Sequence, residues 1–461
     1  MATKQSSRSG NIRKFELHQA KNNGTTIDIS GSVTEIKYYE DILSNSVSLS
    51  AIIAETGETD DDNIGNKGIL DGLPVRGGEP STIHIEDHDG TSLNFKGDSK
   101  LYVNRVRNVI SGTSKDVYVL DFVPRELFAN EQCRVVKRYD GKISENIKKI
   151  LEKDTSKSAG IKTKKKLNID ETNLEYNFIG NDRKPFYVCT WLASKAVPAK
   201  AGKLGGIAGF LFYETYKGYN FRSIDVLFDT KQNEVKGRYI FTNTDDEPTG
   251  YDGKILDYGI DRDIDLQNNL VIGAYANRTL FFDFYAMNYK VRNFSVDESG
   301  GADNNEGAGS KDKIETAGKS GSFPGDTVAD EFRKPVSRLM NRVKDVGTLP
   351  PGKDWEEQLK AWKDKPDKET YDSTKIMVQS VMRYNQMFSI KINITIAANF
   401  DLCAGDLIYC EFPQISTEPN TPTNEQSGGI YMISSLCHRL TTRDAYTSLT
   451  LVRDTFGKKS S

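Results

Sequence analysis

Apolar and polar residues alternate along most of the chain over residues 15–124. A period of two is typical of β-strands, and Val117 to Val123, which is apolar on both faces, predicts a strand buried on both sides. About five or six such strands within residues 15–130 predict a small antiparallel barrel or sandwich. The polar residues 1–14 are expected to form a disordered arm, and the Gly- and Asp-rich stretch 57–80 a long loop.

The pattern changes to a helical period between residues 131 and 237. One helix is predicted after Asp140-Gly141, and a second begins near Asn181 with Pro185 in its first turn. A hairpin over residues 209–216 and a strand to Phe228 follow, so the region predicts a helix-containing α+β domain. The helices place these apolar residues on their buried faces: Ile143, Ile147, Ile150 and Leu151 in the first, and Phe186, Cys189, Leu192, Ala193 and Ala196 in the second.

Strand patterns return in residues 238–290 and 378–456, which together predict a second β-barrel. The clearest alternation in the chain runs from Phe388 to Ile396, where large apolar residues occupy every second position. We expect its polar side to face a neighbouring molecule or an open bore; these residues are Ser389, Lys391, Asn393 and Thr395. The fold class is therefore mainly β with an α+β insert, in which two antiparallel β-barrels are joined by a helix-containing domain.

Residues 291–377 are predicted as an insertion into the second barrel, and residues 457–461 as a tail. Residues 295–328 are rich in Gly, Ser, Asp and Glu, a composition that cannot bury enough apolar area to order itself, so we expect this loop to be flexible. Two helices are predicted after it. The first begins at Pro335 with Val336, Leu339, Met340 and Val343 on one stripe, and the second, capped by Asp354, has Trp355, Leu359 and Trp362 on one face.

Composition and charge exclude several classes of protein. The 62 basic and 65 acidic residues leave a net charge of −3, whereas a dedicated nucleic-acid binder carries a clear basic excess. The longest apolar stretch, residues 269–289, is interrupted by Arg278 and Asp283, so no membrane span is predicted. The N-terminus lacks the apolar core of a secretion signal, and we expect synthesis in the cytosol. The five widely spaced cysteines lack a C-x-x-C pair and are expected to be reduced.

The sequence contains few candidates for chemistry. His84 and His88 share one face of a predicted strand beside carboxylates, but without a third ligand at fixed spacing a polar strand edge is the better interpretation. The acidic run 60–62 and the basic run 162–166 are interpreted as solvated loops. The Trp355, Leu359 and Trp362 stripe is either a partner-docking face or ordinary core. We therefore predict no catalytic residue, no cofactor and no metal site.

Four blocks of the sequence resemble the baseplate central hub proteins of T-even-type contractile-tailed phages (myoviruses), especially those of cyanophages. The family is related to the hub part of type VI secretion spike proteins. The order of elements is similar over nearly the whole chain, with departures at the acidic loop 57–80 and the large insert 291–377. The blocks are Asp140–Leu151, Arg183–Ala193 with Ala208–Thr215, Asn399–Ile408, and Ile430–His438 with Tyr446–Asp454.

The resemblance implies a non-enzymatic structural protein of the virion, assembled in the host cytoplasm into the tail baseplate. Each subunit would carry two barrels like those of tail tube proteins, and a homotrimer would present six barrels in a pseudo-six-fold ring. The implied partners are the trimeric spike or tail lysozyme on one side, and tail tube initiator and baseplate wedge proteins on the other. DNA would pass through the bore during genome ejection without being bound specifically.

Two alternatives remain open from the sequence. The same architecture would serve as the hub of a phage-like injection device or a type VI secretion spike. A secreted carbohydrate-binding or glycosidase protein could also be rich in β-strands, aromatic residues and acids. That class normally shows a signal peptide and Trp platforms on strands, whereas all three Trp here fall on predicted helices.

Overall fold

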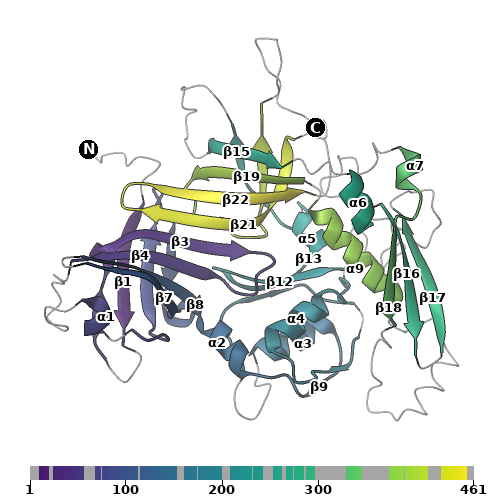
Figure 1. Ribbon diagram of the computed structural model, residues 1–461, viewed down its shortest axis with the longest axis horizontal. Helices are drawn as coiled ribbons and strands as arrows, with labels where there is room; N and C mark the ends of the chain where they lie inside the picture. Colours follow the sequence, from purple (N-terminus) through teal and green to yellow (C-terminus); the bar gives the residue numbers. More distant parts are fainter. Residues whose placement is uncertain are drawn as a thin grey trace.

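The computed structural model describes seventeen stretches of the chain (Figure 1). The fold is mainly β, with several antiparallel sheets and a few helices, which confirms the predicted fold class. The described residues are 10–19, 24–56, 68–73, 75–112, 115–152, 160–173, 175–199, 208–230, 232–241, 253–261, 266–273, 275–284, 287–295, 329–344, 373–388, 390–413 and 427–453.

The first β unit consists of a four-stranded sheet packed on four strands of a larger sheet. The alternation of its sequence is the cause, because every second side chain enters the shared core, including Phe15, Ile36 and Phe122. The smaller sheet has the order β2–β1–β5–β6, with β1 Asn11–His18, β2 Thr26–Asp28, β5 Ser81–Glu86 and β6 Ser92–Phe95. The strands opposite are β3 Val33–Asp41, β4 Ser48–Glu55, β7 Leu101–Ser111 and β8 Asp116–Pro124.

Two predicted boundaries in this unit are wrong. Strand β1 begins at Asn11, inside the expected disordered arm, because Asn11 and Ile12 pair with Glu86 and Ile85 of β5. The sequence of the arm does not reveal this distant pairing partner. Part of the expected loop 57–80 is also ordered into the core: the short helix α1, Ile69–Gly72, buries Ile69 completely.

The second β unit is a barrel of six strands. They follow the order β14–β20–β21–β22–β19–β15, and a parallel bridge between Ile240 and Lys254 connects β14 back to the start of β15. Its core contains Tyr239, Ile392 and Leu451. The strands are β14 Val235–Ile240, β15 Ile255–Asp261, β19 Ile390–Ala397, β20 Leu407–Glu411, β21 Gly429–Thr441 and β22 Ala445–Arg453.

The two β units are joined by strand pairing into one ten-stranded sheet. Strand β21 pairs with β3 in antiparallel register from Ser435 opposite Asp41 to Thr441 opposite Glu35. The main path of the sheet is β15–β19–β22–β21–β3–β4–β8–β7, so strands separated by some 400 positions lie side by side (Figure 1). The sequence predicted two separate units and did not predict this continuity.

The helix-containing domain lies between the two β units in the sequence and has its own core. The two predicted helices are confirmed, with Ile147, Cys189 and Leu192 fully buried. The hairpin is longer than predicted: residues 210–215 form its first strand and residues 218–223 its second. Residues 224–228 form a helix instead of a continued strand, because Ile224, Leu227 and Phe228 are spaced to face one side of a helix. The elements are α2 Arg125–Gln132, β9 Arg138–Tyr139, α3 Ile143–Glu152, β10 Leu167–Ile169, β11 Phe178–Ile179, α4 Pro185–Ala193, β12 Phe210–Thr215, β13 Gly218–Ser223 and α5 Ile224–Phe228.

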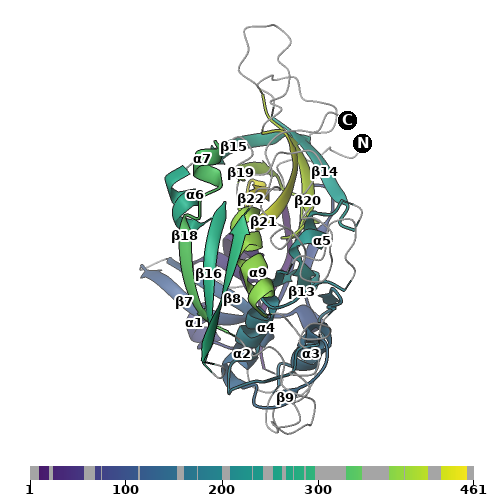
Figure 2. The same cartoon turned by 90° about the vertical axis from the view of Figure 1, so that its right-hand side faces the viewer.

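A separate three-stranded sheet, in the order β17–β16–β18, occupies one end of the molecule (Figure 2). It corrects three predictions. Residues 276–283 and 288–290 belong to strands of this sheet and not to the second barrel. The predicted helix from Pro335 is strand β18, and residues 378–387 lie in helix α9. The elements are α6 Leu266–Ile272, β16 Ala276–Asp283, β17 Asn288–Ser295, α7 Asp330–Arg333, β18 Arg338–Val343 and α9 Ser373–Met387.

The helix prediction from Pro335 failed because a neighbouring strand overrode local preference. Strand β18 pairs in parallel with β16, from Asn277 opposite Arg338 to Phe282 opposite Val343. Apolar residues at positions 336, 339, 340 and 343 fit one face of a helix. Pairing with β16 instead provides hydrogen bonds for the backbone N–H and C=O groups that a helix would have bonded internally. The loop 296–328 and the second predicted helix, with Trp355, Leu359 and Trp362, lie outside the described residues.

Candidate functional site

The ten-stranded sheet presents one continuous polar face that crosses both β units. Alternation places these side chains: in β3, Ile36, Tyr38 and Glu40 point into the core, whereas Glu35, Lys37 and Tyr39 point outward. Lys391, Asn393 and Thr395 do the same in β19. Two adjoining hollows of about 600 and 480 Å³ lie on this face, one over each β unit, and both are lined by Tyr39. We call this surface the polar sheet face.

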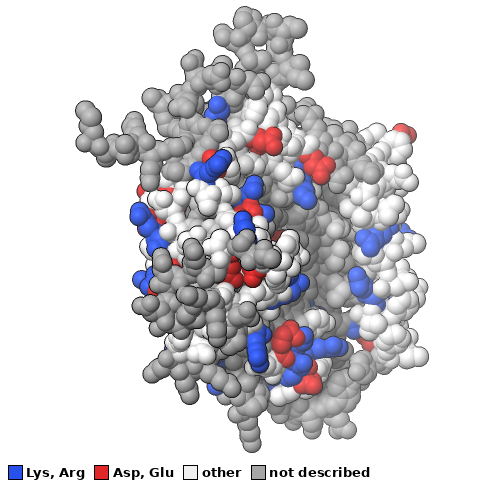
Figure 3. Space-filling model, turned by 60° about the vertical axis from the view of Figure 1, so that its left-hand side comes forward, with Lys and Arg blue, Asp and Glu red and all other residues white. Residues whose placement is uncertain are grey.

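Basic and acidic residues on the polar sheet face are equal in number. They lie on strands of both β units, so the balance extends across the whole surface. The basic residues are Lys37, Arg105, Arg107, Lys391 and Arg439, and the acidic residues are Glu35, Asp41, Asp121, Asp257 and Asp261. On the face of the molecule shown in Figure 3, Lys and Arg are likewise interspersed with Asp and Glu without a large patch of one sign.

Ion pairs within the polar sheet face occupy most of these charges. Asp121 lies 2.9 Å from Nη2 of Arg105 and 2.8 Å from Nε of Arg107, and it also accepts a hydrogen bond from Ser50. Partial burial alone would raise the pKa of Asp121, but the hydrogen bonds from the two arginines lower it. Glu35 pairs with Arg439 and with Lys37 in the same way, and its pKa is also lowered. The carboxylates therefore stay ionised, and each one offsets one of the two positive charges beside it.

Beneath this surface, the carboxylate of Glu40 connects three parts of the chain. It accepts hydrogen bonds from the hydroxyl of Tyr38, the backbone amide of Tyr216 in the helix-containing domain, and the backbone amide of Ala404 in the second β unit. Burial raises the pKa of Glu40 to about 7, although these hydrogen bonds work in the opposite direction. Glu40 thus fixes the relative positions of the units that carry the polar sheet face.

A second buried cluster corrects the prediction of a solvated loop for part of the run 162–166, while Lys162, Lys164 and Lys166 are exposed as expected. Lys165 is buried, with its Nζ 2.6 Å from Glu214 and 3.5 Å from Glu126. The other oxygen of Glu214 accepts a hydrogen bond from the backbone amide of Val47, just before β4. Burial raises the pKa of Glu214, while Lys165 lowers it. The cluster fastens the first β unit to the helix-containing domain, a role that the run of lysines did not reveal.

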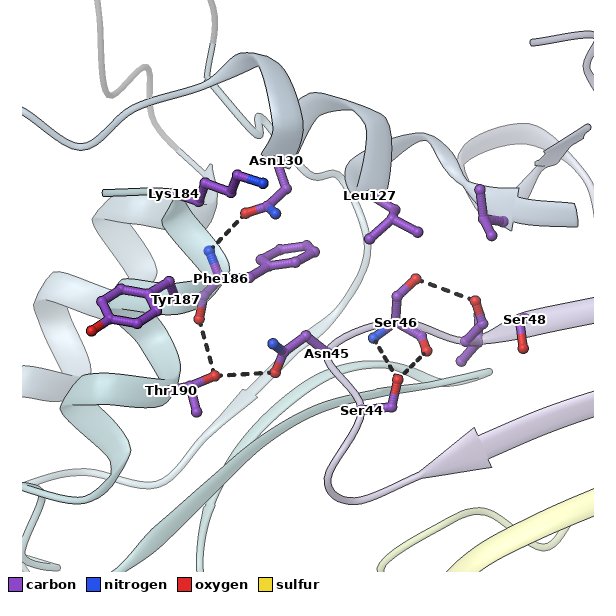
Figure 4. A pocket seen from close by; sticks show the side chains of 12 residues that line it. Ser44, Asn45, Ser46, Ser48, Leu127, Asn130, Lys184, Phe186, Tyr187 and Thr190 are labelled. Atoms are coloured by element: carbon purple, nitrogen blue, oxygen red, sulfur yellow. Dashed lines mark hydrogen bonds between the residues drawn. The ribbon is translucent and has the colours of Figure 1, made fainter. Parts of the chain in front are cut away.

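Another hollow, of about 570 Å³, lies between the β3–β4 loop and helices α2 and α4 (Figure 4). Its polar groups mostly bond to one another: Asn130 accepts from the backbone amide of Phe186, and Thr190 donates toward Asn45. The Lys184 ammonium at its rim is paired with Glu131. The hollow is therefore a junction between two packed units, without a converging set of reactive groups among its described lining residues.

The structure separates the two histidines considered as metal ligands. His84 lies on β5 beside Glu86, whereas His88 lies in the following turn beside Asp89. Within the described stretches, no three His, Cys, Asp or Glu side chains are grouped so as to hold a metal ion. The acidic run 60–62 and the Trp355, Leu359 and Trp362 stripe lie outside those stretches. No helix in the described part of the chain has the length and apolar character to cross a membrane.

Only a small part of the polar sheet face could be predicted from the sequence, namely Lys391, Asn393 and Thr395. The same alternation was visible in β3 and β4, but it could not reveal that their polar sides continue those of β19 and β22. The described residues define a mainly β protein built around one extended polar sheet. This is the feature that a function must explain.

No protein-family model and no curated protein sequence matches this chain. Among solved structures, the chain is similar to the 43 kDa tail protein of prophage MuSo2 from Shewanella oneidensis, with 9% sequence identity, a TM-score of 0.48, and coverage of 96% of this chain and 98% of that one. It is also similar to the tail protein from Neisseria meningitidis MC58, with 10% identity, a TM-score of 0.46 and coverage of 97% of both chains. A component of the type VI secretion system of E. coli shows 9% identity, a TM-score of 0.39, and coverage of 98% of this chain and 79% of that one.

Proposed function

We propose that this chain is the central hub of a contractile phage tail baseplate of the T-even type. The observation that carries the proposal is the ten-stranded sheet, because it gives one subunit two β units with a shared, charge-balanced polar face. The sequence resemblance to cyanophage-like hub proteins supports the same role. The protein is then a non-enzymatic component of the virion that is assembled in the host cytoplasm.

In this proposal, three subunits form a closed ring in which the polar sheet faces line a central bore. The main path of each sheet ends at β7 on one side and at β15 on the other, where the bridge to β14 lies just before the strand, at Lys254. Open strand edges favour pairing with another chain, and a ring in which β7 of one subunit approaches β15 of the next protects these edges. Six β units around a three-fold axis then present a pseudo-six-fold surface to the tail tube.

The charge balance of the polar sheet face suits a bore that passes DNA without holding it. Binding to the phosphate backbone depends on unpaired Lys and Arg, each of which releases counterions when it contacts a phosphate. Here Arg105 and Arg107 share Asp121, and Arg439 and Lys37 share Glu35. The proposed partners are the trimeric spike or tail lysozyme below the ring, and tail tube initiator and baseplate wedge proteins above it.

The decisive measurement is the mass of the purified protein by light scattering over micromolar concentrations, with and without the spike. We expect a trimer in at least one condition and a three-fold ring in negative-stain images. A strict monomer in both conditions, with the β-sheet content intact, would exclude a trimeric hub. Such a monomer would leave a carbohydrate-binding or glycosidase protein as the class to examine.

A substitution at the edge of the sheet tests the proposed ring contact. Ile110 is exposed on β7, and Ile110→Lys adds a charge to this edge strand without changing the core. We expect weaker trimer formation with unchanged circular dichroism. The matched control is Ile179→Lys, which changes another exposed strand isoleucine, on β11 in the helix-containing domain. Equal loss of assembly in both variants would argue against a contact at β7.

A further inference from the structure

The three-stranded sheet β17–β16–β18 has one buried side and one exposed apolar side. Asn277, Thr279 and Phe281 of β16 are buried. The alternate residues point the other way: Phe282 stands opposite Tyr289 of β17 and opposite Val343 of β18, with the rings of Phe282 and Tyr289 6.4 Å apart. We call this outward side the outer apolar face; its large apolar residues are Leu280, Phe282, Tyr289, Val291, Leu339 and Val343.

The exposure of this face is unusual for a sheet. Leu339 and Val343 of β18 are 69% and 60% exposed, and Tyr289 of β17 is 64% exposed. These two strands flank β16, so the three residues lie on one side of the same sheet. Arg278, Asn293 and Asn341 lie on the same side, between these apolar residues. Single exposed apolar residues are common, but six large ones gathered on one side of a sheet usually mark a site that another segment or molecule covers. Figures 1 and 2 show the sheet at one end of the molecule, with helix α9 on its inner side.

The chain itself supplies an occupant of suitable length and pattern. Residues 345–372 leave from the end of β18, which forms one side of the outer apolar face. They re-enter at α9, where the hydroxyl of Thr374 accepts a hydrogen bond from Nε of Arg292 of β17. Both ends of this connection are therefore held at the same small sheet. Residues 345–353 can span up to about 30 Å when extended, which is enough to return along a strand of about 20 Å.

The sequence of this connection carries one apolar stripe. Trp355, Leu359 and Trp362 have the spacing i, i+4, i+7 of a single helical face, after the capping residue Asp354. A helix of about ten residues is marginal alone in water, so such a stripe requires a surface to pack on. Tethering at both ends gives the segment a high effective concentration at the neighbouring sheet, in the millimolar range for a short flexible tether.

We propose that residues 354–362 dock on the outer apolar face of the same chain, with the two tryptophans packed over Phe282, Leu339 and Val343. The docked segment removes apolar surface of both partners from water. It also gives the Trp355, Leu359 and Trp362 stripe an intramolecular role, in place of the external partner or the ordinary core that the sequence left open.

Tryptophan fluorescence tests this docking, because the chain has three tryptophans and the third, Trp191, is partly buried against the core of the helix-containing domain. In full-length protein carrying Trp191→Phe, only Trp355 and Trp362 emit. We expect emission at a shorter wavelength and weaker acrylamide quenching than in the same protein unfolded in urea. Emission and quenching equal to those of the unfolded protein would overturn the proposal.

Paired substitutions then locate the docking site. In the same background, Leu339→Ser with Val343→Ser should shift the emission to longer wavelength and raise quenching toward the unfolded value. The control Leu43→Ser changes another exposed leucine, in the β3–β4 loop, and should leave both signals unchanged. If acrylamide quenching of the two tryptophans is weak and the outer-face variant changes neither quenching nor emission, the segment docks elsewhere and the proposal is rejected.

Two further measurements distinguish docking within one chain from docking between copies. Protection that is constant over a hundredfold dilution supports the intramolecular arrangement, whereas protection lost together with a fall in mass shows a second copy on the face and rejects it. Independently of the serine variants, Leu339→Cys with Leu359→Cys should form an intrachain disulfide under mild oxidation. Its absence in folded protein would count against the proposal.

Discussion

The backbone amide of Ala404 donates a hydrogen bond of 2.8 Å to Oε2 of Glu40, across a separation of 364 positions in the sequence. Glu40 lies on β3 of the first β unit, and Ala404 precedes β20 of the second. The bond lies directly under the junction of β3 and β21, so a single buried carboxylate helps to hold the two β units in one sheet.

Glu40 should make the stability of the protein depend on pH. Because burial raises its pKa to about 7 in the folded protein from 4.5, its contribution to stability is complete below about pH 4.5 and is lost as pH rises through 7. At 1.36 kcal/mol per pKa unit, the loss amounts to about 3 kcal/mol. Urea unfolding between pH 5 and 8 measures it. In Glu40→Gln, which does not titrate, we expect a smaller decline over this range, and identical slopes for the two proteins would contradict the prediction.

Removing the shared acid of the polar sheet face should create affinity for DNA. Asp121→Asn frees Arg105 and Arg107 from their common ion pair, so the wild-type protein should bind duplex DNA weakly and the variant about tenfold more tightly at low salt. Fluorescence anisotropy at several salt concentrations measures this change. Asp89→Asn removes one charge from the exposed turn after β5 and should leave affinity unchanged. An equal increase in DNA affinity in the two variants would show that net charge alone is responsible and would contradict the prediction.

Substitutions on the two sides of strand β19 should affect fold stability and assembly separately. Ile392 and Ile394 are buried in the second barrel, so Asp at either position should cost roughly 3 kcal/mol or more and unfold the barrel. Asn393 lies between them on the polar sheet face, and Asn393→Asp should keep the fold while weakening the trimer. Circular dichroism with urea unfolding reports the first effect, and light scattering reports the second. A stable Ile392→Asp protein would contradict the assignment of these residues to the core.

The buried Lys165 should be far more sensitive to substitution than its neighbour. Lys165→Met leaves the carboxylates of Glu214 and Glu126 buried without their cation, and losses of about 3–5 kcal/mol are typical when one partner of a buried pair is removed. Lys164, which is exposed, provides the matched control: Lys164→Met should change the free energy of unfolding by less than about 1 kcal/mol. Thermal and urea unfolding compare the two, and similar effects would disprove the structural role of Lys165.

Elements with a strong local pattern were predictable from the sequence. Helices α3 and α4 were found because their apolar residues follow a helical period, and the core positions of β19 were found because large aliphatic residues alternate with polar ones. In each case the side chains that enter the core are close in sequence. The spacing of apolar residues within one helix or strand is then enough to predict which of its sides is buried.

Elements that depend on a distant partner were not predictable. Strand β18 has an apolar spacing that also fits a helix, and its parallel pairing with β16 decided the outcome. The buried positions of Glu40 and Lys165 depend on Ala404 and Glu214, which the sequence places far away. Charged residues are normally exposed, and they become buried only where such partners compensate the loss of water.

The sequence by itself therefore determined a mainly β protein with a helix-containing domain and an alternating polar side on its strands. Only the tertiary structure decided that β3 and β21 join the two β units, and that the polar sides of their strands form one charge-balanced surface. The physical reason is that periodicity fixes which side of a strand is buried. Which strands become neighbours is set by backbone hydrogen bonds and ion pairs between residues hundreds of positions apart.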